Sequence, residues 1–435
     1  MGILGKKLST EPYKGVRDFY PEDMYIQRWM FGIMRKVVES FGYTEYDASV
    51  LEPSELYRAK SGEEIANEQT YNFKDRGGRE VTLRPEMTPT LARMIAARER
   101  GLAFPLRWYS IPNVFRYENP QRGRLREHWQ LNVDVFGISN IEAEIEVISI
   151  ASLIMKNLGA KDSDFVVKIN SRKLINELYA LYGLDEEKSY KLSKLIDKKD
   201  KISMDNLRAG AELILGNKAS DFLETIGFNK VLIEKLGEKN KEVKNLVYVI
   251  ESLSKLGIKN VLFTPSLLRG FDYYTGFVFE VFDTNPTNSR SLFGGGRYDE
   301  LLEIFGKRKI PATGFGMGDV TTREFLKTRN LLPTYKSPTD LYICVLNPKL
   351  ANEINAITER LRQSGVWIAV DWSERKIGEQ IKTADKQKIP FVVCIGENEI
   401  KNGEFKVKEL LTGKEKILPE NEITEFIKGI KKIKL

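Results

Sequence analysis

Hydrophobic residues recur at helical spacing in two long segments of the chain. From Met24 to Phe41 apolar side chains return every three or four residues, which is the pattern of an amphipathic helix with one buried face. A second helical pattern runs from Ile141 to Leu158. Both helices are expected to pack against another layer. The apolar stripe of the first consists of Ile26, Trp29, Met30, Ile33, Met34, Val37 and Val38.

Between these helices the pattern shortens to strands. The turn sequence DRGG at Asp75 to Gly78 separates TYNFK from REVTLRP, which predicts a hairpin. Two further β-rich stretches run from Leu106 to Glu118 and from Trp129 to Gly137. We therefore predict an α+β domain whose antiparallel sheet is flanked by helices.

The 435 residues are too many for one hydrophobic core, and the pattern changes twice more along the chain. Residues 171–259 are rich in Leu, Lys, Glu and Ile at helical spacing, which predicts a helical insertion between residues 1–170 and 260–332 of one domain. In the second part, Gly294 to Gly296 are interpreted as a turn, and a helix is expected near Asp319. Residues 338–435 form a separate α/β domain, because LYICVL, VWIAVD and FVVCIG alternate with helical segments as in a βαβαβ unit.

Composition excludes several classes of protein. Two cysteines and one histidine are too few for a disulfide framework, a thiolate zinc site or a multi-histidine metal centre, so no protein-bound metal is predicted. Eighteen apolar residues never occur together, and the amino-terminal segment has no apolar core, so neither a membrane span nor a signal peptide is expected. A cytoplasmic location fits best. The formal net charge of +7 is compatible with nucleic acid but decides nothing alone.

The most informative stretch is FRYENPQRGRLREHWQLNVDVFG, residues 115–137. Strand side chains alternate between two faces, so Arg116 and Glu118 share a face, as do Gln130, Asn132 and Asp134. Such a polar surface is costly to bury without a ligand, which favours a binding floor over an ordinary polar sheet face. The loop arginines suit phosphate recognition, although a solvated loop has the same composition. They are Arg122, Arg124 and Arg126.

These residues resemble motif 2 of the class II aminoacyl-tRNA synthetases. LLRGFDYYTGFVFE, residues 267–280, resembles the signature peptide of the histidyl-tRNA synthetase family, and LRPEMT, residues 83–88, resembles its amino-acid-binding strand. GGGRYD and the C-terminal domain, which resembles an anticodon-binding domain, extend the likeness over nearly the whole chain.

The resemblance implies a histidine pocket. Glu86 and Thr88, with Met87 between them, would hold the α-amino group of histidine, and Gln130 would orient it. Asp134 and Tyr274 would contact the imidazole, whose donor and acceptor a carboxylate and a phenol can match. Tyr273 and, as a weaker candidate, Tyr298 would also belong to the histidine pocket.

The resemblance also implies an ATP site, with Mg²⁺ accompanying the nucleotide. Arg116 and Arg269 would be the catalytic cations, both near the histidine carboxylate and the reacting α-phosphate; Glu118 would lie near adenine, and Arg124 would bind ATP from its loop. Attack of a carboxylate on a phosphate needs charge neutralisation and alignment more than a proton shuttle. A catalytic histidine is therefore not required, and His128 is expected to be a loop or strand-edge residue.

Simpler structural roles remain open for several of these residues. Tyr273 and Tyr274 could be core aromatics, Arg269 could be a salt-bridge partner, and Glu86 could cap a helix that begins near Thr88.

Two positions depart from the family pattern. Motif 1 usually has a proline where this chain has Ser49, which concerns the dimer interface. In motif 3, GFGMGDVTTREF, the expected arginine falls at Thr321. Arg323 is no simple substitute, because two residues along a helix turn a side chain by about 200°. Either a basic residue between Arg290 and Lys309 contacts the γ-phosphate, or ATP is handled differently.

By this resemblance the chain is expected to be a homodimeric enzyme. It would join histidine to ATP as histidyl-adenylate and then transfer the aminoacyl group to the 3′ end of histidine tRNA. The alternative is a non-catalytic relative, either a histidine-binding regulatory subunit of an ATP phosphoribosyltransferase or a sensor of uncharged tRNA.

Overall fold

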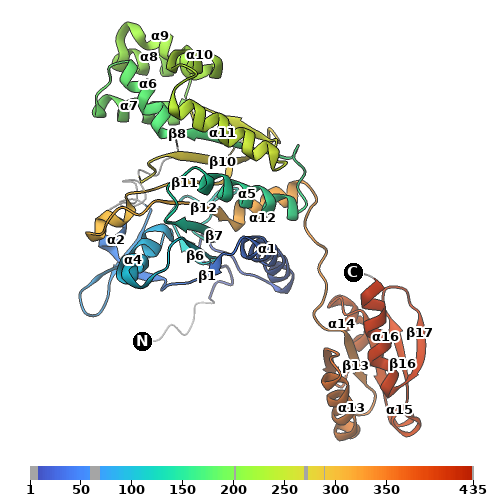
Figure 1. The fold of residues 1–435 in the computed structure, drawn as a ribbon. Coiled ribbons are helices and arrows are strands. Elements are labelled where there is room, and N and C mark those ends of the chain that lie inside the picture. The colour runs from blue at the N-terminus through green and yellow to red at the C-terminus, as the bar shows by residue number, and fades with distance from the viewer. Residues whose placement is uncertain (1–7, 59–68, 200–201, 269–272, 289, 434–435) are drawn as a thin grey trace. The chain divides into compact units, whose positions relative to one another are not determined.

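The computed structural model describes residues 8–58, 69–199, 202–268, 273–288 and 290–433, and the chain divides into two compact units, Met1–Leu332 and Pro333–Leu435 (Figure 1). This division confirms a separate C-terminal α/β domain. The finer boundaries at residues 170, 259 and 332 stay predictions, because the first unit is not divided further.

The first unit is built on a nine-stranded sheet in the order β1-β5-β7-β12-β11-β10-β8-β9, with β6 paired to β7. Its interior pairs are antiparallel, as predicted, whereas the edge pairs β1–β5 and β8–β9 are parallel. The strands are β1 (Thr44–Glu45), β5 (Leu106–Ser110), β6 (Asn113–Phe115), β7 (Glu127–Phe136), β8 (Phe165–Ser171), β9 (Val261–Phe263), β10 (Phe277–Asp283), β11 (Ser291–Arg297) and β12 (Ala312–Gly318).

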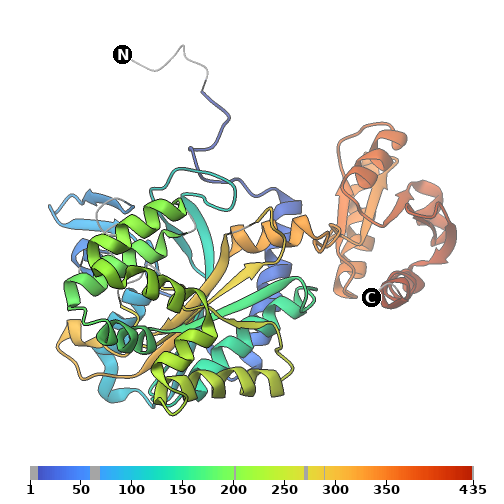
Figure 2. The same cartoon turned by 90° about the horizontal axis from the view of Figure 1, so that it is seen from above.

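Three helices cover one face of this sheet: α1 (Pro21–Ser40), α5 (Glu142–Asn157) and α12 (Asp319–Thr328) (Figure 2). The predicted apolar stripes lie in the shared core, where Met34 of α1 and Ile150 of α5 are fully buried with Val133 of β7. The other face carries a smaller core with α4 (Thr88–Arg98) and the 3-10 helix η4 (Leu301–Phe305). One face of β7 therefore packs in the hydrophobic core, and the opposite face lines a pocket.

A three-stranded sheet contains the predicted hairpin. Strands β3 (Tyr71–Lys74) and β4 (Glu80–Leu83) pair antiparallel, and β4 also pairs with β2 (Leu51–Pro53), which leads into α2 (Ser54–Arg58). The Asp75 side chain closes the turn by accepting from the backbone N–H groups of Gly77 at 2.8 Å and Arg79 at 2.9 Å. The hairpin is confirmed, and its turn is fixed by an aspartate as the sequence indicated.

Helices fill the predicted insertion between β8 and β9. Their start signals are local: Asp185 and Ser203 accept from backbone N–H groups in the first turns of α7 and α8. Buried residues here, such as Phe222 and Val249, belong to the same core cluster as Val133 of the sheet. The helices are α6 (Arg172–Leu181), α7 (Glu186–Asp197), α8 (Met204–Leu215), α9 (Ala219–Gly227), α10 (Asn229–Leu236) and α11 (Lys241–Lys255).

The prediction of a turn at Gly294 to Gly296 is wrong, because these glycines lie inside β11. A Cβ atom on Gly295 would meet the carbonyl oxygen of Gly314 at 2.0 Å, and one on Gly296 would meet that of Phe277 at 2.6 Å. Their function is therefore close approach between strands rather than a change of chain direction.

The second unit has the predicted βαβαβ arrangement. Strands β13 (Leu341–Val345), β14 (Ile368–Asp371) and β15 (Phe391–Ile395) are parallel, in the order β14-β13-β15, and two antiparallel strands that the sequence analysis did not place extend the sheet. These are β16 (Glu404–Glu409) and β17 (Glu415–Pro419). The helices are α13 (Ala351–Gln363), α14 (Ile377–Lys386), α15 (Glu397–Asn402) and α16 (Glu420–Ile433). Among the described residues of either unit, no helix has the length and hydropathy of a membrane span.

Candidate active site

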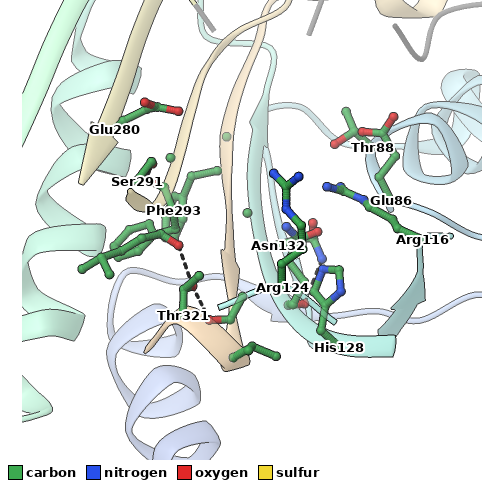
Figure 3. A pocket seen from close by; sticks show the side chains of 18 of the residues that line it. Glu86, Thr88, Arg116, Arg124, His128, Asn132, Glu280, Ser291, Phe293 and Thr321 are labelled. Carbon is green, nitrogen blue, oxygen red and sulfur yellow. Dashed lines mark hydrogen bonds between the residues drawn. The ribbon is translucent and has the colours of Figure 1, made fainter. Parts of the chain in front are cut away.

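A pocket of about 270 Å³ opens on the polar face of β7 in the first unit. Figure 3 shows Glu86, Thr88 and Arg116 along one wall, and Glu280, Ser291 and Thr321 along the opposite one. Ten of the twelve predicted site residues line it. They are Glu86, Thr88, Arg116, Glu118, Arg124, Gln130, Asp134, Tyr273, Tyr274 and Tyr298.

The other two predicted residues are Met87 and Arg269. The Met87 side chain is fully buried and is not among those that line the pocket, so the structure places it in packing rather than at a ligand. It precedes α4, whose first residue is Thr88, and its carbonyl accepts from the N–H of Leu91 at 2.8 Å. Arg269 lies outside the described residues.

The pocket floor is the polar face of β7, where Gln130, Asn132 and Asp134 lie side by side as predicted. The neighbouring strand β12 supplies glycines opposite them. A Cβ atom on Gly314 would meet Asp134 Oδ1 at 2.2 Å, and one on Gly316 would meet Gln130 Nε2 at 2.7 Å. The alternate glycines of β12 therefore make the space that the polar side chains occupy.

Asp134 is the carboxylate of this floor, and its pKa is shifted from the usual value. The hydroxyl of Tyr298 donates to its Oδ1, whereas Oδ2 is buried without a hydrogen-bond partner among the described residues. Burial raises the pKa of Asp134 to about 7, against the lowering effect of the Tyr298 hydrogen bond. A buried acceptor without a donor is costly, so Oδ2 is suited to accept from an N–H group of a ligand.

Three tyrosine rings close this end of the pocket. The ring centroids of Tyr273 and Tyr274 are 4.9 Å apart, and those of Tyr273 and Tyr298 are 5.8 Å apart. The Tyr273 hydroxyl donates to Glu86 Oε2 at 3.2 Å. The expected contacts of Asp134 and Tyr274 with an imidazole stay predictions, and the hydroxyl that reaches Asp134 belongs to Tyr298, which the sequence analysis ranked as the weaker candidate.

Two arginines line the pocket. Arg116, which follows β6, donates from Nε to the carbonyl oxygen of Pro85 at 3.0 Å. Arg124 Nε lies 2.8 Å from Glu118 Oε2. Their remaining N–H groups provide the forked donors that phosphate oxygens accept.

The three loop arginines, which the sequence suggested for phosphate recognition, lie in different surroundings. Arg124 lines the pocket, and Arg122 lines an adjoining cavity. Arg126 is buried, with its guanidinium carbon 4.1 Å from the Tyr117 ring centroid, and it donates to the carbonyl oxygen of Glu118 at 3.1 Å. Arg126 therefore supports the loop and does not line the pocket.

His128 is a pocket residue that the sequence analysis placed at a loop or strand edge. It lies on β7 and lines the cavity. Burial, together with the nearby charges of Arg116 and Arg17, lowers its pKa to about 3, so the imidazole is neutral at physiological pH. Position 128 shares the even-numbered face of Gln130 and Asp134, and this alternation could have identified it.

Thr321 and Arg323 occupy the first turn of α12. The Thr321 side chain lines the pocket and donates to the carbonyl oxygen of Leu292 at 2.6 Å. Arg323 Nη2 lies 2.5 Å from Asp23 Oδ1 on α1 and lines neither cavity. This position agrees with the expectation that Arg323 does not replace the motif 3 arginine, which stays a prediction.

In the second unit, α14 carries an exposed basic face. Its lysines Lys382 and Lys386, with Lys388 just after the helix, are exposed, while Ala384 is fully buried. Ile377 was expected on the buried stripe but is 39% exposed, because it lies at the first residue of the helix.

Comparisons with known proteins agree with this architecture. Residues 15–319 match the family model described as histidyl-tRNA synthetase, and residues 340–432 match the anticodon binding domain. A histidine–tRNA ligase of Leptospira biflexa is 42% identical over 437 aligned residues, which cover 99% of this chain and 98% of the relative. One from Thermoplasma volcanium is 38% identical, with 97% of this chain and 99% of the relative covered.

The fold also has solved counterparts. The crystal structure of histidyl-tRNA synthetase from Nostoc superposes with a TM-score of 0.81 and 24% identity, covering 97% of this chain and 99% of that one. At this identity the likeness concerns the fold alone. The family-model match and the near full-length relatives show that the chain belongs to the histidyl-tRNA synthetase family.

Proposed function

We propose that this chain is a histidine–tRNA ligase whose pocket joins histidine to ATP and passes the aminoacyl group to the 3′ end of histidine tRNA. The observation that carries the proposal is the buried, unpartnered Oδ2 of Asp134 in a pocket that Arg116 also lines. A ligand that fills this pocket needs an N–H donor for Asp134 and an anionic group for Arg116. Histidine beside a nucleotide phosphate has both.

The histidine end follows from the donors and acceptors present. Asp134 Oδ2 accepts an imidazole N–H, while Tyr298 orients the carboxylate. Glu86, held by Tyr273, accepts from the α-ammonium group together with the Thr88 hydroxyl. Gln130 lies on the floor and orients the backbone of the amino acid. Tyr274 closes the wall against the imidazole ring.

The first chemical step occurs beside Arg116. A carboxylate oxygen of histidine attacks the α-phosphorus of ATP, a new P–O bond forms, and the bond to the bridging oxygen of the β-phosphate breaks with its electron pair, so pyrophosphate leaves. Arg116 neutralises the charge that develops on the α-phosphate oxygens, and Arg124 and Glu118 hold the nucleotide. Arg269 is proposed as a second cation at this phosphate on the family resemblance alone.

The second step uses the same cations. The terminal ribose hydroxyl of the tRNA attacks the carbonyl carbon of histidyl-adenylate, its proton passes to a phosphate oxygen of the departing AMP, and AMP leaves with the electron pair of the broken C–O bond. Arg116 remains placed to stabilise the leaving phosphate. The exposed lysine face of α14 and the anticodon-binding match support contact between the second unit and the RNA backbone.

Mg²⁺ is proposed to enter with ATP. Magnesium ions are typically held by one or two carboxylates together with substrate phosphates and water. Glu280 provides a carboxylate on the wall beside Ser291, so the residues fit such an ion (Figure 3). When bound, it would supply positive charge to the phosphates. We also propose that the chain acts as a homodimer in the cytoplasm, as the family resemblance implies.

The ligase is favoured over a histidine-binding regulatory subunit or a tRNA sensor, because the ligases match nearly the full length, including the anticodon-binding domain. Histidine-dependent exchange of labelled pyrophosphate into ATP tests the first step on the intact chain. We expect exchange with histidine and not with glutamine or phenylalanine. Folded protein that binds histidine but gives no exchange would overturn the proposal in favour of the regulatory function.

A further inference from the structure

A second cavity of about 260 Å³ adjoins the pocket beyond Thr321. Four residues line both spaces, so the two adjoin along the start of β11 and α12. These are Gly123, Ser291, Leu292 and Thr321. The far part of the second cavity carries Arg122, Arg290 and Glu324. A ligand whose reacting phosphate lies at Arg116 could extend past Thr321 into this space.

Arg290 is held there by neutral groups of the motif 2 loop. Its Nη2 donates to Gln121 Oε1 at 2.9 Å, and its Nη1 lies 3.5 Å from the carbonyl oxygen of Arg122. Among the described residues, no carboxylate forms an ion pair with Arg290. The guanidinium is therefore positioned by its partners without being neutralised.

The two pocket-lining arginines of the neighbouring loop are balanced by carboxylates. Arg122 Nη2 lies 2.6 Å from Glu324 Oε1, and both side chains line the second cavity. Arg124 is paired with Glu118 in the main pocket. Arg290 is therefore the source of the excess positive charge in the second cavity.

Thr321 lines both cavities and lies where they adjoin. Its hydroxyl is turned to backbone oxygens, at 2.6 Å from Leu292 O and 3.3 Å from Gly318 O. A side chain as long as arginine at this position would reach into the junction. Compared with the family pattern, the short Thr321 side chain therefore lacks the motif 3 cation, and it also takes up less of the space between the main pocket and Arg290.

We propose that Arg290, oriented by Gln121, binds the β- and γ-phosphates of ATP in this second cavity and takes the place of the motif 3 arginine that is absent at Thr321. The inference rests on the proposed function, because it assumes that the α-phosphate lies at Arg116. In the adenylation step the electron pair of the broken bond remains on pyrophosphate. Arg290 stabilises that leaving group, and in the reverse reaction it binds pyrophosphate.

The test is the pyrophosphate exchange of Arg290→Gln in the full-length chain. We expect the KM values for ATP and for pyrophosphate to rise about tenfold or more, because a charge-assisted fork is lost. The Kd values for histidine and for AMP are expected to stay unchanged, since neither reaches the second cavity. Gln121→Ala is expected to raise the same two KM values by roughly fivefold, through loss of one orienting hydrogen bond.

Arg308→Gln is the matched control, because Arg308 is an exposed arginine paired with Glu99 at 2.8 Å and lines neither cavity. It is expected to leave both KM values unchanged. Normal KM values for ATP and pyrophosphate in Arg290→Gln would overturn the inference, and so would an equal loss of AMP affinity. Absence of exchange in the wild-type chain would instead refute the proposed function, so the two failures are distinguishable.

Discussion

The Tyr298 hydroxyl donates to Oδ1 of Asp134 across the pocket floor, from a residue that follows β11 to a residue on β7. The strand between them, β12, has Gly314 opposite Asp134 and so leaves room for the contact. The hydrogen bond fixes one carboxylate oxygen and leaves the other buried and unpartnered. The floor is thereby arranged for a ligand at a cost in stability.

Asp134→Asn is expected to increase the stability of the free protein at high pH and to weaken histidine binding. Because the pKa of Asp134 is raised to about 7, its ionisation is costly in the folded state, and the stability that the protonated carboxyl contributes is lost as pH rises from about 4 to about 7. At pH 8 the free variant should be more stable than wild type by on the order of a few kcal/mol. Histidine affinity should fall at least about 100-fold.

Urea unfolding and calorimetric titration with histidine measure these two effects. At about pH 4, near the pKa of an unfolded aspartate, the carboxyl is protonated in the folded state and about half protonated in the unfolded state, so the stability difference should be small. Asp162→Asn, at an exposed aspartate that pairs with Lys156, serves as the control and should change neither quantity at either pH. Unchanged histidine affinity in Asp134→Asn would remove Asp134 from the pocket's function.

Tyr298→Phe is expected to shift the pH dependence of histidine binding upward. The Tyr298 hydrogen bond lowers the pKa of Asp134, so its loss raises that pKa above 7. Histidine needs the ionised carboxylate, and its own imidazole is neutral above about pH 6.5. Titration between pH 6 and 9 should therefore show a higher midpoint in the variant. An unchanged midpoint would mean that Tyr298 does not tune Asp134.

His128 is the only histidine of the chain, so its imidazole resonance can be assigned without mutagenesis. Its pKa of about 3 predicts that the resonance does not titrate between pH 5 and 8. The unfolded chain takes up a proton at this imidazole near pH 6.5, whereas the folded chain does not. The contribution of His128 to folding stability is therefore lost as pH falls below about 6.5. A resonance that titrates near pH 6.5 would show the imidazole to be solvated.

Gly314→Ala tests the space that β12 leaves for the floor. The added methyl group would lie 2.2 Å from Asp134 Oδ1 and 2.5 Å from the carbonyl oxygen of Val133, and backbone cannot move away as a flexible side chain can. We expect histidine binding to be lost and unfolding to occur at lower urea concentration. Gly378→Ala is the control: it lies in α14 with no atom within 4 Å of the new Cβ, so histidine affinity should stay at the wild-type value.

Much of the site could be predicted from local pattern. The alternation along β7 placed Gln130 and Asp134 on one face, and the Asp75 turn marked the hairpin, because both depend on neighbours in sequence. The same alternation includes His128, but a single aromatic residue at the start of a strand gave no reason to follow it.

The remaining features depend on contacts between distant segments. Nothing local distinguishes Arg126, buried against Tyr117, from Arg124, which lines the pocket two residues earlier. The pairing of Tyr298 with Asp134 joins residues 164 positions apart. Gly294 to Gly296 look like a turn until the neighbouring strands that require them are known.

The most direct measurement is a crystal structure of the full-length chain with histidinol and a non-hydrolysable ATP analogue. The account predicts an imidazole nitrogen within about 3.2 Å of Asp134 Oδ2, with the α-phosphate within hydrogen-bond distance of Arg116. An imidazole bound elsewhere, or a pocket filled by the chain's own side chains while both ligands are present at saturating concentration, would contradict it.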